Sequence, residues 1–242
     1  MKIYAQSDVG KARDMNQDSY SITDEVPYKL CILADGMGGY KGGEIASKLA
    51  VSATENYIKN NFDGIEKNVD QILKLIGNAI EYANMIVYEK SKEDAELKDM
   101  GTTLDVSLIY NGKVYIGHVG DSRVYRIRKN IIRRITTDHS YVEKLVKEGT
   151  ITKEEAINHP KKNMLTKALG CSSYVEPDLL YKVFQSGDIL LMCSDGLTNM
   201  LRENEIYDII VNSNEDVAKK LINSANDLGG YDNITSIVVK NI

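Results

Sequence analysis

Several features that mark other classes of protein are missing from this chain of 242 residues. Its three cysteines (Cys31, Cys171 and Cys193) are too few for a disulfide framework, and no cysteine and histidine spacing is typical of a zinc site. No apolar run approaches the roughly 18 residues of a membrane span. The N-terminal stretch MKIYAQSDVG lacks the apolar core of a signal peptide. We therefore expect a cytoplasmic protein that does not enter a membrane.

The chain also carries fewer positive than negative side chains. The chain has 30 Lys and Arg against 35 Asp and Glu, and its formal net charge of −5 argues against nucleic-acid binding. The local exception is Tyr125–Arg134 (YRIRKNIIRR), where alternation places the arginines on the solvent face of a hairpin. This pattern is more typical of a solvated face, and a docking site for acidic partners is the alternative. The length and ordinary composition predict one globular domain, residues 1–242.

The most informative stretch that is present is Leu30–Gly43, LCILADGMGGYKGG. Its apolar run Leu30–Ala34 predicts a buried strand, which ends at Asp35-Gly36. The glycines that follow remove side chains where another group must approach the backbone closely. Taken alone, an Asp-Gly pair is more typical of a strand that simply reverses direction.

The same pattern recurs along the chain, and this recurrence favours a functional site over a simple turn. Further aspartates occur in the segments RDMNQD, VYIGHVGDSR, ILLMCSDG and GGYDNIT, each at a strand end or in a tight loop. The five aspartates are Asp18, Asp35, Asp121, Asp195 and Asp232. If the strands bring these carboxylates together, cations must neutralise their repulsion. Oxygen ligands of this kind suit Mg²⁺ or Mn²⁺.

The order of predicted elements indicates antiparallel sheets covered by helix pairs, which is an α+β fold. The predicted strands are Lys2–Asp8, Ser19–Asp24, Tyr28–Ala34, Thr103–Tyr110, Lys113–Val119, Ser122–Arg128, Ile131–Thr136, Leu179–Phe184, Asp188–Cys193 and Ile234–Val239. The predicted helices are Glu44–Asn61, Val69–Lys92, Glu203–Val211 and Asn214–Asp227. Turn residues predict hairpins at Asn111-Gly112, Lys129-Asn130 and Gln185–Gly187. Consecutive hairpins argue against a doubly wound parallel sheet.

One segment, Asp138–Gly170, differs in character from its surroundings. It is polar and helical in short pieces, with a possible capping box from Thr152 to Glu155. A helical insertion among strands is a candidate flap beside a site.

Taken in order, the motifs RDMNQD, LADGMGG, GTT, VGDSRVYR, DHS, LTKALG, CSDGL and GGYDNIT resemble those of the PPM family. This is the family of metal-dependent protein serine/threonine phosphatases (type 2C), and the bacterial members are the most similar. The resemblance covers about Ser7 to Val239. It implies a four-layer α-β-β-α sandwich in which two antiparallel sheets are flanked by helix pairs, with a flap at about 138–170.

The resemblance also implies roles for individual residues. Asp35 looks like the carboxylate that bridges two metal ions, with the Gly36 carbonyl as a further ligand. Asp195 and Asp232 resemble ligands of the first ion, and Asp18 resembles a ligand of the second, partly through water. Asp121 looks like a ligand of a third, weaker ion shared with Asp195. Arg13 resembles the residue that clamps the substrate phosphate.

The implied reaction is hydrolysis of phosphoserine and phosphothreonine by direct attack of a water activated between two Mn²⁺ or Mg²⁺ ions. A permanently charged guanidinium at Arg13 would grip the phosphate as charge develops. The chain has no CxxxxxR loop and no DxD at the first strand end, so a phosphoenzyme is not expected. Expected partners are phosphorylated proteins and a cognate serine/threonine kinase, with no nucleic acid or membrane. The chain itself is expected to be a monomer.

Two positions depart from the family pattern and leave the proton donor for the leaving group open. Met37 stands where eukaryotic members have a histidine, and Tyr40 stands where many bacterial members have one. His139 is more typical of a structural histidine beside the site than of a catalyst. Two other functions also remain open: a binding module that has lost activity, and a phosphatase specialised for anti-sigma-factor antagonists.

Overall fold

The computed structural model describes residues 1–24, 27–93, 95–213 and 215–242, and for Tyr40 only the backbone. The strands are β1 (Lys2–Asp8), β2 (Asp18–Asp24), β3 (Lys29–Met37), β4 (Gly101–Thr102), β5 (Leu104–Tyr110), β6 (Lys113–Val119), β7 (Arg123–Arg128), β8 (Ile131–Arg134), β9 (Asp178–Val183), β10 (Ile189–Cys193) and β11 (Ile234–Lys240). The helices are α1 (Gly39–Asn61), α2 (Val69–Glu93), η1 (Ala95–Leu97), α3 (Tyr141–Lys147), α4 (Lys153–Ile157), α5 (Asp195–Thr198), α6 (Glu203–Val211) and α7 (Val217–Asp227).

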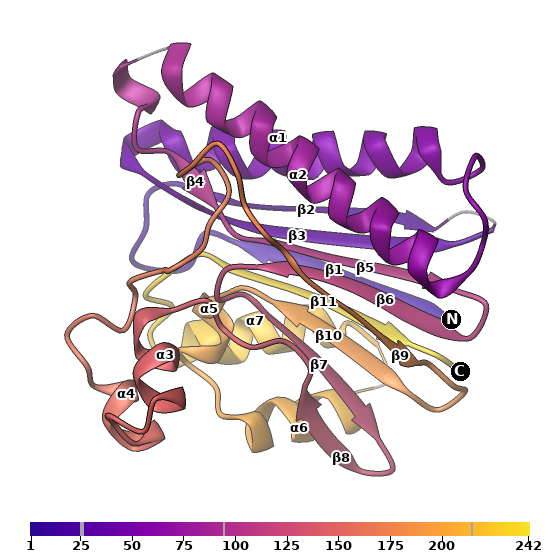
Figure 1. Cartoon of the computed structure of the whole chain (residues 1–242). Helices are drawn as coiled ribbons and strands as arrows, with labels where there is room; N and C mark the ends of the chain where they lie inside the picture. The colour runs from indigo at the N-terminus through magenta and orange to yellow at the C-terminus, as the bar shows by residue number, and fades with distance from the viewer. Residues whose placement is uncertain (25–26, 94, 214) are drawn as a thin grey trace.

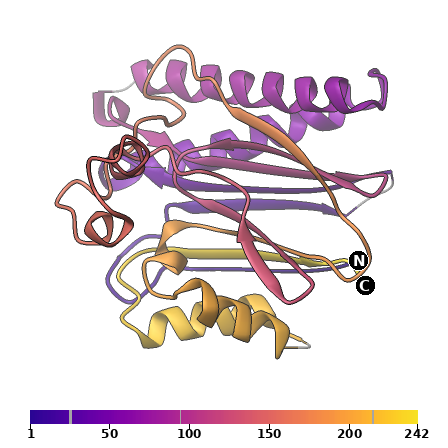
Figure 2. The ribbon, with the colours of Figure 1, turned by 60° about the horizontal axis from the view of Figure 1, so that its bottom comes forward.

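Over the described residues, these strands form two antiparallel sheets. One has the order β1-β11-β10-β7-β8, and the other has the order β2-β3-β5-β6-β9, with β4 paired to the end of β3. Helices α1 and α2 cover the second sheet, while α6 and α7 cover the first, as Figures 1 and 2 show. The predicted four-layer α-β-β-α sandwich is therefore confirmed.

Three apolar cores hold the layers together. Leu30, Ile32 and Ala34 of β3 face the helix pair α1 and α2, whereas Cys31 and Leu33 face the other sheet. This alternation follows from the two-residue period of a strand. Because both faces of β3 are buried, the run reads as continuously apolar in the sequence, as predicted.

Two of the predicted hairpins are confirmed. Asn111 and Gly112 join β5 to β6 with φ of 46° and 70°, and Lys129 and Asn130 join β7 to β8 with φ of 49° and 61°. Positive φ at both central residues is the geometry that matches the twist of two paired strands. Asparagine and glycine tolerate it better than other residues do.

The third predicted hairpin is wrong. β9 pairs with β6 in one sheet, whereas β10 lies between β11 and β7 in the other, so the chain changes sheets at 184–188. A short connection suggested pairing, but residues Leu190–Cys193 are fully buried. A strand that is buried to this extent takes the centre of a sheet, where it has a neighbour on each side.

Some boundaries also differ from those predicted. Helix α1 begins at Gly39 rather than Glu44, and β3 continues through Asp35 to Met37 because β4 pairs with its end. The predicted helix start at Asn214 lies outside the described residues, and α7 begins at Val217. No described helix is long and apolar enough to cross a membrane.

The topology brings the aspartate-bearing ends together. β1, β3, β6 and β10 all run toward one end of the sandwich, and β2 and β11 start there. Figure 1 shows both chain termini at the opposite end. Helices α3 and α4 lie beside the aspartate-bearing end.

Candidate metal centre

Two of the predicted ligands are direct neighbours in the sheet. Asp18 at the start of β2 lies opposite Asp35 near the end of β3. Like charges that face each other across a strand pair destabilise the sheet. This register therefore places two carboxylates where a cation would relieve their repulsion.

The Asp18 carboxyl group is buried and only half satisfied. Its Oδ2 accepts hydrogen bonds from Ser194 Oγ (2.8 Å) and Thr235 Oγ1 (2.7 Å), whereas its buried Oδ1 has no partner. Burial raises the pKa of Asp18 to about 7, with further raising by Asp195 and Asp232, although the two hydroxyl groups oppose this shift. The free oxygen is available to a cation or to its water.

The backbone of Asp35 is held by two threonines that the sequence analysis left unassigned. Its N–H donates to Thr103 Oγ1 (2.9 Å), and its carbonyl accepts from the Thr102 hydroxyl (2.9 Å) and the Thr103 N–H (2.9 Å). Burial raises the pKa of Asp35 well above its ordinary value, and the nearby Asp18 and Asp195 raise it further. The GTT motif therefore sets the position of this carboxylate.

Each Asp-Gly pair needs its glycine because another backbone lies close by. A Cβ at Gly36 would lie 2.1 Å from the Gly43 carbonyl oxygen, and a Cβ at Gly196 would lie 2.0 Å from that of Asn233. Either contact is far inside the van der Waals distance. The glycines thus let helix α1 and the start of β11 approach the two aspartates.

The remaining carboxylates also repel one another. Burial and then Asp232 raise the pKa of Asp195, whereas a hydrogen bond from Asn199 opposes the shift. Burial and then Asp195 raise the pKa of Asp121 to about 8. Because these aspartates raise one another's pKa values, the cluster carries more negative charge than the chain itself neutralises.

Arg13 reaches this cluster from the loop between β1 and β2. Its Nη2 donates to Asp232 Oδ2 at 2.8 Å, and this contact raises the pKa of the guanidinium. Asp195 and Asp35 raise the pKa of Arg13 more weakly. The Arg13 side chain remains half exposed, so it faces the opening of the site and is accessible to a ligand.

The loop that carries Arg13 and Asp18 is fastened by Asn233. Its Nδ2 donates to the carbonyls of Val9 and Met15 (both 2.9 Å), and its Oδ1 accepts from the N–H of Gln17 (2.8 Å). Asn233 is 6% exposed. One amide side chain thus ties both ends of this loop to β11, next to Asp232.

The donor set fits hard divalent cations. It consists of carboxylate and carbonyl oxygens with one orphaned buried oxygen on Asp18, and such ligands suit Mg²⁺ or Mn²⁺. Among the described residues, no three carboxylate, imidazole or thiol groups converge into a ready-made metal cluster. Asp195 already lies beside Asp35, whereas Asp232 contacts Arg13 and would turn away from it to bind a cation.

A dependence of stability on pH follows from these carboxyl groups. Between about pH 6.5 and pH 8.5, unfolded aspartates are ionised, whereas folded Asp18 and Asp121, with pKa values of about 7 and about 8, still hold protons at the lower pH. The folded state binds more protons, so its free energy of unfolding falls as pH rises. We expect the melting temperature of chelator-treated protein to fall across this range. Excess Mn²⁺ should flatten the dependence, and an unchanged melting temperature would contradict the cluster.

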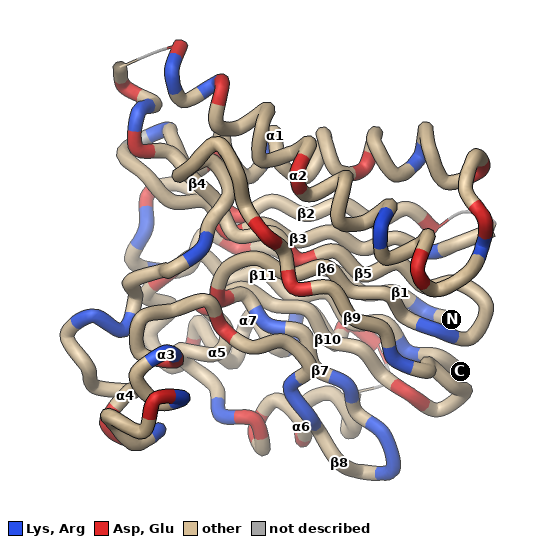
Figure 3. The backbone as a smooth tube through the Cα atoms, in the orientation of Figure 1, with Lys and Arg blue, Asp and Glu red and all other residues tan. Residues whose placement is uncertain are grey.

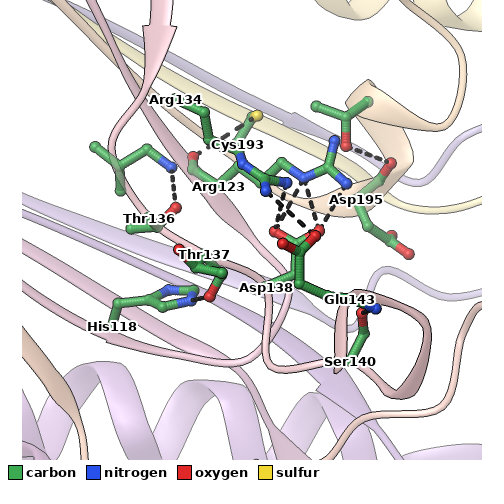
Figure 4. A network of polar contacts seen from close by, with 12 residues as sticks. His118, Arg123, Arg134, Thr136, Thr137, Asp138, Ser140, Glu143, Cys193 and Asp195 are labelled. Carbon is green, nitrogen blue, oxygen red and sulfur yellow. Dashed lines mark hydrogen bonds and ion pairs between the residues drawn. The ribbon is translucent and has the colours of Figure 1, made fainter. Parts of the chain in front are cut away.

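The start of the 138–170 segment is anchored beside this cluster. Asp138 binds Arg123 in a two-pronged contact (Nε to Oδ1 3.1 Å, Nη2 to Oδ2 2.7 Å) and also pairs with Arg134 at 3.2 Å. Figure 4 shows this network next to Asp195. Because Arg123 follows Asp121 by two residues, the network joins the segment to the Asp121 loop.

His139 has a structural role in the described contacts. Its Nδ1 accepts from the Gly120 N–H at 3.1 Å, and its ring stacks on His118 with centroids 4.8 Å apart. Burial lowers the pKa of His139 to about 4, and His118 lowers it further. A neutral ring that accepts a hydrogen bond is poorly suited to donate a proton at neutral pH. The side chain of Tyr40 lies outside what the structure describes.

The sequence analysis therefore placed the charged groups but missed the residues that hold them. Those residues are Thr102, Thr103, Ser194, Thr235 and Asn233, all nearly or fully buried. Each of them lies inside a motif quoted in the sequence analysis (GTT, CSDGL or GGYDNIT), but no role was assigned to it there.

Comparisons with a family model, related proteins and solved structures give one consistent result. The family model for protein phosphatase 2C matches residues 10–230. A serine/threonine phosphatase of Listeria welshimeri is 37% identical over 238 residues, which cover 97% of this chain and 94% of that protein. The structure of the S. agalactiae serine/threonine phosphatase matches with a TM-score of 0.89 and 37% identity, covering 99% of both chains.

A third relative was solved with cations. The catalytic domain of the serine/threonine protein phosphatase PstP, in complex with two manganese ions, matches with a TM-score of 0.85 and 33% identity, covering 98% of this chain and 96% of that one. Full-length likeness to these proteins and a family match over residues 10–230 point the same way. The chain belongs to the protein phosphatase 2C family of serine/threonine phosphatases.

Proposed function

We propose that this protein hydrolyses phosphoserine and phosphothreonine in other proteins, and that it acts against a serine/threonine kinase. The observation that carries the proposal is that five aspartates and Arg13 lie close enough together, at one end of the sandwich, to shift one another's pKa values. Such a set supplies oxygen ligands for cations and a guanidinium for phosphate. Two divalent ions bound there would lower the pKa of a water molecule and neutralise phosphate charge.

The chain's own residues would share the work as follows. Asp35, fixed by Thr102 and Thr103, would be shared between two cations, together with the Gly36 carbonyl. Asp195 and Asp232 would hold one cation, and Asp18 would hold the other through its free Oδ1. Asp121 and Asp195 would bind a third, weaker cation. Arg13 would leave Asp232 and donate to the phosphate oxygens, which orients the phosphorus toward the attacking water.

The direct test is turnover of a phosphoserine peptide with and without metal. We expect hydrolysis with Mn²⁺ or Mg²⁺ and its loss on chelation, because each proposed ligand is a hard oxygen at a solvent-open site. Readdition of Mn²⁺ should restore the rate. Full turnover in metal-free protein would exclude this mechanism. Tight phosphopeptide binding without turnover would instead indicate a binding module.

A second prediction concerns the proton donor for the leaving serine oxygen. Serine alkoxide needs a proton to leave, whereas p-nitrophenolate leaves unaided, and Met37 has no proton to give. A cation held by Asp121 would make a nearby water acidic enough to supply this proton. We therefore expect Asp121→Ala to slow hydrolysis of a phosphoserine peptide much more than that of p-nitrophenyl phosphate. His139→Ala and Tyr40→Phe serve as controls. Equal loss on both substrates would show that Asp121 supports the core site, and a selective loss in a control would move the donor role there.

A further inference from the structure

A second like-charge pair lies across a strand pair, away from the metal centre. Arg126 of β7 is directly opposite Arg133 of β8. Two arginines in this register repel each other and destabilise the hairpin. The Asp18 and Asp35 pair shows the same register with opposite charge and marks the cation site. The arginine pair is therefore a candidate site for an anion.

The chain provides little compensation for this charge. Arg128, two residues further along β7, is neutralised by a two-pronged contact with Asp188 (2.6 Å from Nε to Oδ1). Arg126 donates a long hydrogen bond to the Val183 carbonyl (3.4 Å). Burial lowers the pKa of Arg126, and Arg128 and Arg133 lower it further, whereas Asp188 partly opposes this shift. Within the described residues, neither Arg126 nor Arg133 forms an ion pair with a carboxylate.

A third positive side chain lies on the facing strand. The contact between Arg126 and Val183 brings β7 against β9, where Lys182 is exposed. Leu180 and Phe184 pack into the core between the sheets, so alternation places Lys182 on that same face, toward β7. We call Arg126, Arg133 and Lys182 the basic patch. Figure 3 shows blue segments on β7, β8 and β9 in this region.

We propose that the basic patch binds an acidic segment of a protein partner, namely a run of Asp and Glu residues in a phosphoprotein substrate. Guanidinium groups bind carboxylates in a planar, two-pronged geometry that the Arg128 and Asp188 pair already shows in this hairpin. The patch lies between β8 and β9, each the last strand of its sheet, so an extended peptide has access to it.

A polypeptide fits the charge distribution better than a membrane or a nucleic acid does. The net charge of −5 repels a broad anionic surface, whereas a short acidic segment senses mainly charges within about 8 Å at physiological salt. The proposed function also brings proteins to this molecule. The inference therefore rests on the proposed function for the identity of its ligand, although the binding itself does not require turnover.

The fold sets the spacing between the acidic segment and the phosphorylated residue. Arg126 is five residues along the chain from Asp121, and an extended chain rises by about 3.3 Å per residue, so the two residues lie at most about 16 Å apart. An extended substrate needs roughly five residues to span that distance. Acidic residues placed closer to the phosphoserine would not reach the patch.

The first experiment measures binding without catalysis. A fluorescently labelled hexaglutamate peptide without phosphate is titrated against the metal-free protein by anisotropy. We expect Arg126→Gln/Arg133→Gln to bind it about 5- to 10-fold more weakly at low salt. The matched control Lys219→Gln/Lys220→Gln removes two exposed charges from α7 and should bind as the wild type does. Equal weakening in both variants would overturn the proposal, because it would show a general effect of charge.

The second experiment measures substrate choice. A series of phosphoserine peptides carries four glutamates separated from the phosphoserine by one to eight residues. We expect KM to fall once the spacer reaches about five residues, and this gain to vanish in Arg126→Gln/Arg133→Gln. Turnover of p-nitrophenyl phosphate should be unchanged in that variant, which shows an intact active site. A KM that does not depend on the spacer would overturn the proposal even if every peptide is hydrolysed.

Two further readings complete the test. The melting temperature of Arg133→Gln should equal or exceed that of the wild type, since one of two repelling charges is removed. A fall of several degrees would show that Arg133 has a structural partner and would contradict the assignment. Vesicles containing anionic lipid should not compete with the hexaglutamate peptide, and effective competition would overturn the choice of a protein ligand.

Discussion

Replacing Asp35 with asparagine is expected to lower turnover of a phosphoserine peptide by about a thousandfold or more. This is the upper end of the fall in kcat that follows removal of one group stabilising the charge of a transition state. Asp35 is the carboxylate that Asp18, Asp195, Asp121 and Asp232 all influence, so it lies at the centre of the cluster. A neutral amide has one coordinating oxygen in place of two and no charge. We therefore expect isothermal titration to show that Mn²⁺ no longer binds with high affinity.

The same substitution should stabilise the metal-free protein. It removes one of two carboxylates that face each other across β2 and β3, and it preserves the backbone contacts with Thr102 and Thr103. A raised melting temperature together with lost activity would separate this outcome from misfolding. The control Asp63→Asn changes an exposed aspartate in the loop after α1 and should alter neither property. Normal Mn²⁺ affinity in Asp35→Asn would exclude Asp35 as a shared ligand.

Replacing Arg13 with alanine is expected to lower kcat/KM by about 10- to 150-fold, which corresponds to one charge-assisted contact of about 1.5–3 kcal/mol. Both a higher KM and a lower kcat should contribute, because the phosphate gains charge in the transition state. Arg13 also donates to Asp232, a proposed metal ligand. Removing this competing cation should leave Mn²⁺ affinity unchanged or slightly higher.

Two companion variants sharpen the result. Arg13→Lys keeps the charge but loses the planar fork, so it should recover only part of the activity. Lys11→Ala removes an exposed positive charge from the same loop and should leave both parameters near the wild type. If Arg13→Ala weakened Mn²⁺ binding instead, its role would be to hold Asp232 in place rather than to hold phosphate.

Much of the fold could be predicted from local pattern. The periodicity of α1 and α2, the apolar runs of β3 and β10, and the turn at Asn111-Gly112 each depend on neighbours in the sequence. Such features can be recognised from consecutive residues, because burial repeats every 3.6 residues in a helix and every two residues in a strand. Asp35, Asp121 and Asp195 were recognisable for a related reason, since each follows an apolar run, whereas Asp18 starts a strand and Asp232 comes just before one.

The pairing partner of each strand was harder to predict from the sequence. The pairing of Leu179–Phe184 with Asp188–Cys193 was predicted from a short turn, yet the two strands lie in different sheets. Which sheet accepts a strand depends on the burial of both its faces against segments far away in the chain. A local turn signal does not carry that information.

By itself, the sequence determined the family, the α+β architecture and the aspartates and Arg13 as candidates, because these depend on ordered motifs and local periodicity. Only the tertiary structure showed what holds them. Asn233 reaches across more than 200 positions to fasten the loop 9–17, and Thr103 fixes Asp35 from 68 positions away. Contacts between distant segments are set by packing of the whole sandwich, and no stretch of consecutive residues specifies them.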